Sequence, residues 1–108
     1  MPRRSPEPSS LEEIAARLRI TREALGHTQV MMAKLMGSAT NGQAWENYEA
    51  GRRMISIRHA LALTQSCRLT LEWLYQGQAH NLPPDIRQEI ERLMVRRDQP
   101  TTRKSRSS

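Results

Sequence analysis

The stretch SATNGQAWENYEAGRR, residues 38–53, combines amide side chains with two adjacent arginines. Thr40 or Asn41 can cap a helix, and the nine residues that follow contain no proline and no β-branched side chain. Gly51 suits the left-handed position that ends a helix. We therefore predict a short helix over about 42–50.

The two faces of this short helix differ in chemistry. Ala44, Trp45 and Tyr48 fall at helical spacing and can anchor one face in a core. The other face carries small, amide and acidic side chains, namely Gly42, Gln43, Glu46, Asn47 and Glu49. Small and amide side chains suit close approach to a surface that displays paired hydrogen-bond donors and acceptors. The base-pair edges in a DNA major groove form such a surface.

The positive charge of the chain flanks this helix instead of lying on it. The 108 residues carry a formal net charge of +6. Residues 28–51 hold Lys34 against two glutamates, whereas residues 52–77 hold four arginines against Glu72. Because phosphate contacts position a protein on DNA and base contacts give specificity, this distribution favours a DNA-reading protein. The alternative is that the arginines only keep a small protein soluble.

Other kinds of site find little support. The three histidines fall in different predicted elements, and the single Cys67 excludes an intramolecular disulfide and fits a reducing cytosol. The glycines match no phosphate-binding loop, and paired carboxylates lie on helical faces without an apolar pocket. We therefore expect no enzyme activity, no metal site and no cofactor. No apolar run approaches about 18 residues, so we expect no membrane span.

The rest of the chain shows helices bounded by capping and stop residues. Ser10 and Glu13 form a capping box, Thr28 and Ser56 are further N-caps, and Gly77 is a stop. The predicted helices cover about 11–25, 29–36, 42–50, 57–66 and 71–75, and a sixth begins near Pro84. This order predicts an all-α fold, a five-helix domain with an extra C-terminal helix.

Composition divides the chain into four segments. Residues 1–9 are rich in proline and serine, and we expect a disordered N-terminal arm. Residues 10–77 form the five-helix domain, and residues 78–98 hold a loop and the C-terminal amphipathic helix. Residues 99–108 are rich in serine, threonine and arginine, so we expect a disordered basic tail.

The C-terminal helix carries an apolar stripe that must be buried. Its residues are Leu82, Ile86, Ile90 and Leu93. The stripe can pack on its own domain or on a second copy of the chain. Because a five-helix domain needs no sixth helix to close its core, we favour a homodimer through this stripe. An isologous contact would match a palindromic DNA site.

The order of these motifs resembles the Cro/phage-repressor type of helix-turn-helix, also called the xenobiotic-response-element family, and especially small proteobacterial or prophage regulators. The resemblance covers about Ile14 to Gly77. It rests on Arg17, Leu18 and Arg22, on Thr28-Gln29, on Ala33 and Gly37, on Tyr48-Glu49-Ala50-Gly51-Arg52-Arg53, and on Leu71-Glu72-Trp73-Leu74. The turn after Gly37 is about two residues longer than the family turn, and Ile55 replaces the usual proline.

The resemblance implies a bacterial transcription regulator, cytoplasmic and nucleoid-associated. It implies a repressor that binds double-stranded DNA at a palindromic operator as a homodimer. The family's base-reading positions carry over onto Asn41, Gly42, Gln43 and Asn47. Its phosphate contacts carry over onto Thr28 and Gln29, where free amides at a helix N-terminus favour an anion. They also carry over onto Arg52 and Arg53, which lie where the following loop passes the DNA backbone.

Three alternatives stay open. If Thr40 is the N-cap, Thr40-x-x-Gln43 is a capping box, and Gln43 would fold back onto the Thr40 amide instead of meeting a base. Arg52 and Arg53 can be a solvated pair near a helix end. The whole fold can also serve as a protein-interaction adaptor, or as an antitoxin that binds both an operator and a toxin.

Overall fold

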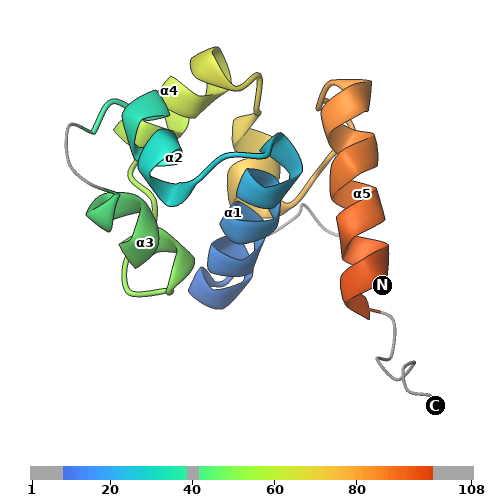
Figure 1. Ribbon diagram of the computed structural model, residues 1–108, viewed down its shortest axis with the longest axis horizontal. Helices are drawn as coiled ribbons and strands as arrows, with labels where there is room; N and C mark the ends of the chain where they lie inside the picture. The colour runs from blue at the N-terminus through green and yellow to red at the C-terminus, as the bar shows by residue number, and fades with distance from the viewer. Residues whose placement is uncertain (1–8, 39–41, 99–108) are drawn as a thin grey trace, which may run out of the picture.

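The computed structural model describes residues 9–38 and 42–98 (Figure 1). Within these ranges the chain forms six helices and no strand. They are α1 (Leu11–Leu25), α2 (Gln29–Leu35), α3 (Gln43–Glu49), α4 (Ile57–Ser66), η1 (Glu72–Gln76) and α5 (Pro84–Asp98). The all-α prediction is confirmed, and every predicted helix has a counterpart with closely matching ends.

The helix ends follow the capping chemistry of the sequence. Ser10 Oγ accepts a hydrogen bond from the Glu13 amide at 3.1 Å, and the Glu13 carboxylate accepts one from the Ser10 amide at 2.9 Å. Thr28 and Ser56 cap α2 and α4 by accepting from the amide three residues ahead. These bonds satisfy amides that a helix N-terminus otherwise leaves without partners, so the caps set where these three helices begin.

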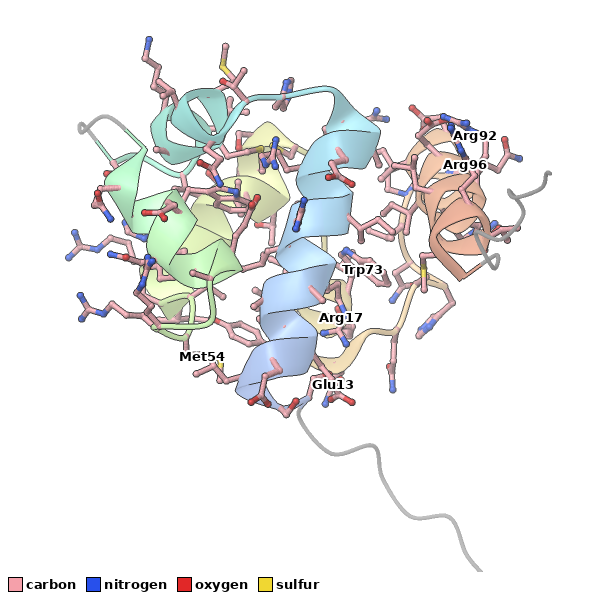
Figure 2. All side chains as sticks on the ribbon, turned by 60° about the horizontal axis from the view of Figure 1, so that its bottom comes forward. Glu13, Arg17, Met54, Trp73, Arg92 and Arg96 are labelled. Carbon is pink, nitrogen blue, oxygen red and sulfur yellow. The ribbon has the colours of Figure 1, made fainter. Side chains whose placement is uncertain are left out.

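The fifth helix has the predicted place but an unexpected type. Residues 72–76 wind as a π-helix that ends at Gly77, where φ is +77°. Arg17 braces this turn, because its guanidinium donates to the Leu74 carbonyl at 3.1 Å and lies 5.5 Å from the centroid of the Trp73 ring (Figure 2). Burial lowers the pKa of Arg17. A Cβ at Gly77 would lie 2.7 Å from Arg17 Nη2, so this position favours glycine for space as well as for φ.

One core joins all six helices. Its fully buried side chains include Ile14, Leu18, Met32, Met36, Trp45, Ile55, Leu63, Leu74 and Ile90. Among the described residues, Thr21 is the buried polar member of this interior. Its hydroxyl donates to the Arg17 carbonyl at 2.6 Å and accepts from the Trp73 indole at 2.9 Å. Both hydrogen-bonding roles of the hydroxyl are therefore used, which offsets the cost of burying it.

Helix α5 packs on its own chain, next to α1 (Figures 1 and 2). The exposed fractions of Leu82, Ile86 and Ile90 are 4%, 5% and 2%, and Leu93 is partly buried against the same core. The expected dimer seam at these four residues is therefore corrected, since their side chains already lie inside one protomer. Packing within a chain avoids the loss of translational and rotational freedom that association costs, and α1 supplies the apolar partner.

Candidate nucleic-acid interface

Helices α2 and α3 pack on each other at one side of the molecule, and α3 also contacts α1 (Figure 1). The chain between them includes Thr40 and Asn41, which lie outside the described residues. The base-reading role predicted for Asn41 therefore also falls outside them. The predicted cap is wrong, because the N-cap of α3 is Gly42. Helix α3 thus begins at Gln43.

Gly42 belongs to the contact between α2 and α3. It is buried, its φ is +96°, and a Cβ there would lie 3.3 Å from backbone and side-chain atoms of Val30. The base-reading role predicted for Gly42 is therefore wrong, because the residue is buried in this contact. The glycine instead meets two local needs, a left-handed backbone and close approach of α2.

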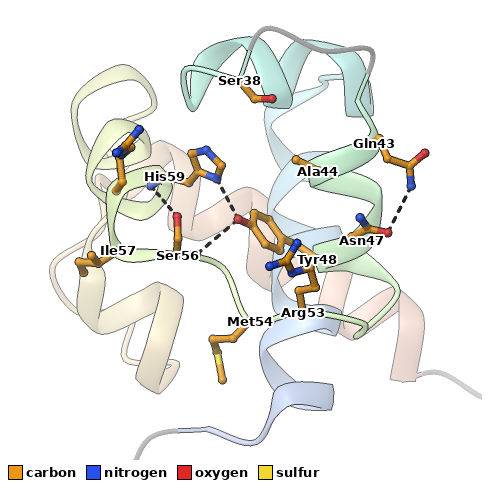
Figure 3. A pocket seen from close by; sticks show the side chains of 11 residues that line it. Ser38, Gln43, Ala44, Asn47, Tyr48, Arg53, Met54, Ser56, Ile57 and His59 are labelled. Atoms are coloured by element: carbon orange, nitrogen blue, oxygen red, sulfur yellow. Dashed lines mark hydrogen bonds between the residues drawn. The ribbon is translucent and has the colours of Figure 1, made fainter.

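Gln43 is exposed at the first position of α3. Its Nε2 donates to Glu46 Oε1 at 2.9 Å and to Asn47 Oδ1 at 3.2 Å, the second bond being drawn in Figure 3. Because Gly42 is the N-cap, Gln43 does not stand three residues after it. The structure therefore contradicts the capping-box alternative, and the Gln43 side chain lies on the outer surface of α3.

Arg52 completes a polar surface over α3. Its Nη1 donates to Asn47 Oδ1 at 2.9 Å and lies 3.4 Å from Glu46 Oε2. We call the four side chains of Gln43, Glu46, Asn47 and Arg52 the outer network. The Glu46 and Arg52 side chains are 42% and 55% exposed. The outer network is thus preformed and open to a ligand.

A second network backs α3 from the inside. Arg22 Nε donates to Glu49 Oε2 at 2.6 Å, Gln29 Nε2 donates to Glu49 Oε1 at 3.0 Å, and the Trp45 indole also donates to the Glu49 carboxylate. We call these four residues the inner network. The Glu49 side chain is 7% exposed, so the sequence prediction that placed Glu49 on the outer face is wrong. Its partners come from α1, α2 and α3, and the inner network fixes these helices relative to one another.

A groove of about 800 Å³ lies beside α3, between it and the start of α4 (Figure 3). Arg53 and Arg58 both line this groove, together with Met54 and Ile57. Arg53 was predicted from the sequence to contact a phosphate, whereas Arg58 had no predicted role. The sequence signal for Arg58 was its position in the first turn of the helix that Ser56 caps, a few residues after the loop that follows α3.

Tyr48 and His59 close one side of the groove. The Tyr48 hydroxyl and His59 Nδ1 lie 2.8 Å apart, and the two rings meet edge to face with centroids at 5.9 Å (Figure 3). Burial, and then the neighbouring charge of Arg58, lower the pKa of His59. The imidazole is therefore mainly neutral at pH 7 and acts as a hydrogen-bond partner for α3.

The described residues give little support to other kinds of site. Within residues 9–38 and 42–98, no three His, Cys, Asp or Glu side chains gather where they could hold a metal ion. None of the helices that the structure describes is long and apolar enough to cross a membrane. Cys67 is a buried free thiol, and burial raises its pKa. A raised pKa disfavours the reactive thiolate, so nucleophilic chemistry gains no support at Cys67.

Comparison with known proteins agrees with this geometry. A family model described as a helix-turn-helix domain matches residues 13–74, from α1 to η1, and includes α2, α3 and the link between them. No curated protein and no solved structure gives a significant match. The family match covers more than half of the chain and includes the three helices that the inner network holds together. The chain therefore belongs to the helix-turn-helix domain family.

Proposed function

We propose that the protein is a sequence-specific DNA-binding transcription regulator that places α3 in the major groove. The observation that carries this proposal is the outer network, an exposed array of amide and carboxylate groups on α3 with the Arg52 guanidinium from the loop that follows. The same helix is fixed from behind by buried Trp45 and Tyr48. A rigid helix with an exposed polar face meets the geometric needs of base reading, and we assign that reading to Gln43 and Asn47.

Basic side chains beside α3 suit the DNA backbone. We propose that Arg53, predicted from the sequence, and Arg58, found in the structure, contact phosphates from the groove beside α3. Thr28 and Gln29 stay proposed phosphate contacts at the start of α2. Since the Gln29 side chain donates to Glu49, its contact would come from the backbone amide.

At a finer level, we propose a bacterial repressor of the Cro/phage-repressor type that binds a palindromic operator as a homodimer. The support is the sequence resemblance, and the DNA geometry that places two recognition helices about 34 Å apart in successive major grooves. The stripe on α5 is buried in its own protomer, so the dimer must use another surface. Such a protein acts at the nucleoid in the cytoplasm.

A second candidate function rests on apolar exposure near the groove. Met54 and Ile57 are 46% and 56% exposed. Such side chains suit a protein partner, as in an adaptor or in an antitoxin-type regulator that also binds a toxin. A pure adaptor has no need of Arg53 and Arg58 beside α3, and for this reason we favour DNA binding.

Binding to labelled random duplex at two salt concentrations tests the class of function. We expect affinity to fall steeply with salt, because phosphate contacts release counterions. The double variant Arg53→Ala/Arg58→Ala should bind much more weakly. Arg92→Ala/Arg96→Ala removes equal charge from α5 (Figure 2) and serves as the control, with a smaller loss. A wild-type protein with no affinity for DNA at low salt would favour the adaptor.

A further inference from the structure

The outer network contains a carboxylate that phosphate binding alone does not require. We propose that Glu46 is a specificity-determining residue that accepts a hydrogen bond from the N4 amino group of a cytosine in the major groove. Arg52 acts as a positioning residue for it. This inference rests on the proposed function, since it assumes that α3 reads DNA.

The geometry holds the Glu46 carboxylate without enclosing it. Oε1 accepts from Gln43 Nε2 at 2.9 Å, and Oε2 lies 3.4 Å from Arg52 Nη1. A carboxylate has about four acceptor sites, so each oxygen keeps capacity for a further donor. The Glu46 side chain is 42% exposed, and that capacity faces solvent.

Asn47 is fixed by the same two donors. Its Oδ1 accepts from Gln43 Nε2 at 3.2 Å and from Arg52 Nη1 at 2.9 Å. Because the carbonyl oxygen of this amide accepts two hydrogen bonds within the protein, Nδ2 is the end of the amide that can donate to a ligand. Glu46 and Asn47 thus present an acceptor and a donor side by side on α3.

Stability does not account for Glu46. An exposed ion pair such as the one between Glu46 and Arg52 contributes little to folding, because water and salt screen it. On a DNA-facing surface the carboxylate also repels phosphates and lowers the affinity for every sequence. That repulsion is offset only where the carboxylate meets a hydrogen-bond donor on a base. Sequences that place a donor there are therefore bound more tightly than those that do not, which is specificity.

The chemistry of the bases selects cytosine. Guanine and thymine present acceptors in the major groove, and adenine presents an acceptor next to its amino group. Cytosine itself presents only its N4 amino group, a donor, so it attracts a carboxylate with no acceptor on the same base. The Asn47 amide can then donate to the guanine O6 of the same base pair.

Selection of bound duplexes from a random pool tests this inference. It uses the wild-type protein, Glu46→Gln, and Glu91→Gln as a control with equal charge change at an exposed site on α5. We expect the wild type and Glu91→Gln to enrich one site with a fixed cytosine. Glu46→Gln should lose about tenfold in preference for that cytosine and gain adenine, because a carboxamide pairs with adenine N6 and N7. It should also bind unselected duplex more tightly.

Two outcomes separate this inference from the proposed function. If the wild type enriches a site and Glu46→Gln enriches that site with the same base preferences, Glu46 reads no base and the inference is wrong. If the wild type enriches no sequence, the proposed function itself fails.

Arg52 provides the test of positioning. Arg52→Ala should weaken the cytosine preference, and Arg52→Lys should restore part of it because the positive charge returns. An Arg52→Ala protein with an unchanged cytosine preference would overturn the positioning role. Thermal melting of each variant shows whether folding is intact.

Discussion

Glu46 and Glu49 stand three residues apart on α3 and have the same kinds of partner, yet their surroundings differ. Each carboxylate meets one arginine and one glutamine. These partners are Gln43 and Arg52 for Glu46, and Gln29 and Arg22 for Glu49, which also accepts from the Trp45 indole. The exposed fraction of the side chain is 42% for Glu46 and 7% for Glu49.

Burial decides what the same chemistry does on the two sides of α3. Removing one partner of a buried ion pair leaves the other charged and poorly solvated, which is strongly destabilising. Removing one partner of an exposed pair leaves a charge that water solvates. The carboxylate of Glu49 is therefore committed to holding α3 on α1 and α2. That of Glu46 is left for a ligand.

The largest effect on stability should come from the buried carboxylate. Glu49→Ala leaves Arg22, Gln29 and the Trp45 indole without their shared acceptor. We expect a loss of about 3 kcal/mol in the free energy of unfolding, measured by urea denaturation. Glu46→Ala is the matched control and should cost less than about 1 kcal/mol. Equal losses in the two variants would contradict the distinction between the outer and inner networks.

Burial should likewise decide the cost of removing apolar side chains on α5. Ile90 and Met94 lie one turn apart, with exposed fractions of 2% and 44%. We expect Ile90→Ala to lower the free energy of unfolding by about 2–3 kcal/mol through the cavity it leaves, and Met94→Ala by much less. Sedimentation of both variants completes the test. A stable Ile90→Ala protein that changes from dimer to monomer would restore the dimer seam at this stripe.

The two arginines that follow α3 should differ in DNA binding. Arg53 lines the groove, whereas Arg52 is bonded to the outer network. We expect Arg53→Ala to lower the slope of log K against log salt by about 0.9, the value for one lost phosphate contact. Arg52→Ala should leave the slope nearly unchanged and alter base preference instead. Equal changes of slope would show that Arg52 also neutralises a phosphate, as the sequence alone predicted.

The smallest effect should come from His59. Its lowered pKa in the folded protein means that the unfolded chain takes up a proton first as the pH falls. Folding stability should therefore be independent of this group above about pH 7, and fall as the pH drops below the ordinary value of 6.5 toward the folded pKa. His59→Gln should remove this part of the pH dependence, while His80→Gln, at an exposed site, should keep it. Identical pH profiles for wild type and His59→Gln would exclude the effect.

Local chemistry made the helices predictable. Ser10, Thr28 and Ser56 act on amides a few residues away, so their caps can be found in the sequence without knowing the fold. The same holds for Gly51 and Gly77, which follow helices with positive φ as predicted.

Contacts between residues far apart in the chain were harder to predict from the sequence. Gly42, the N-cap of α3, lies close against Val30 of α2, and that contact is invisible in a linear sequence. Glu49 looks like an exposed neighbour of Glu46 until Arg22, which lies 27 residues earlier, is placed beside it. The stripe on α5 posed the same difficulty, since periodicity shows that a face is buried without naming what covers it.

The central claim is that the outer surface of α3 meets DNA. Backbone amide chemical shifts of ¹⁵N-labelled wild-type protein, titrated with a duplex from the selection, test it most directly. We predict that the largest changes fall on Gln43, Glu46 and Asn47, with further changes at Arg53 and Arg58, and that α5 changes little. Changes centred on α5, with α3 unaffected by saturating duplex, would contradict the account.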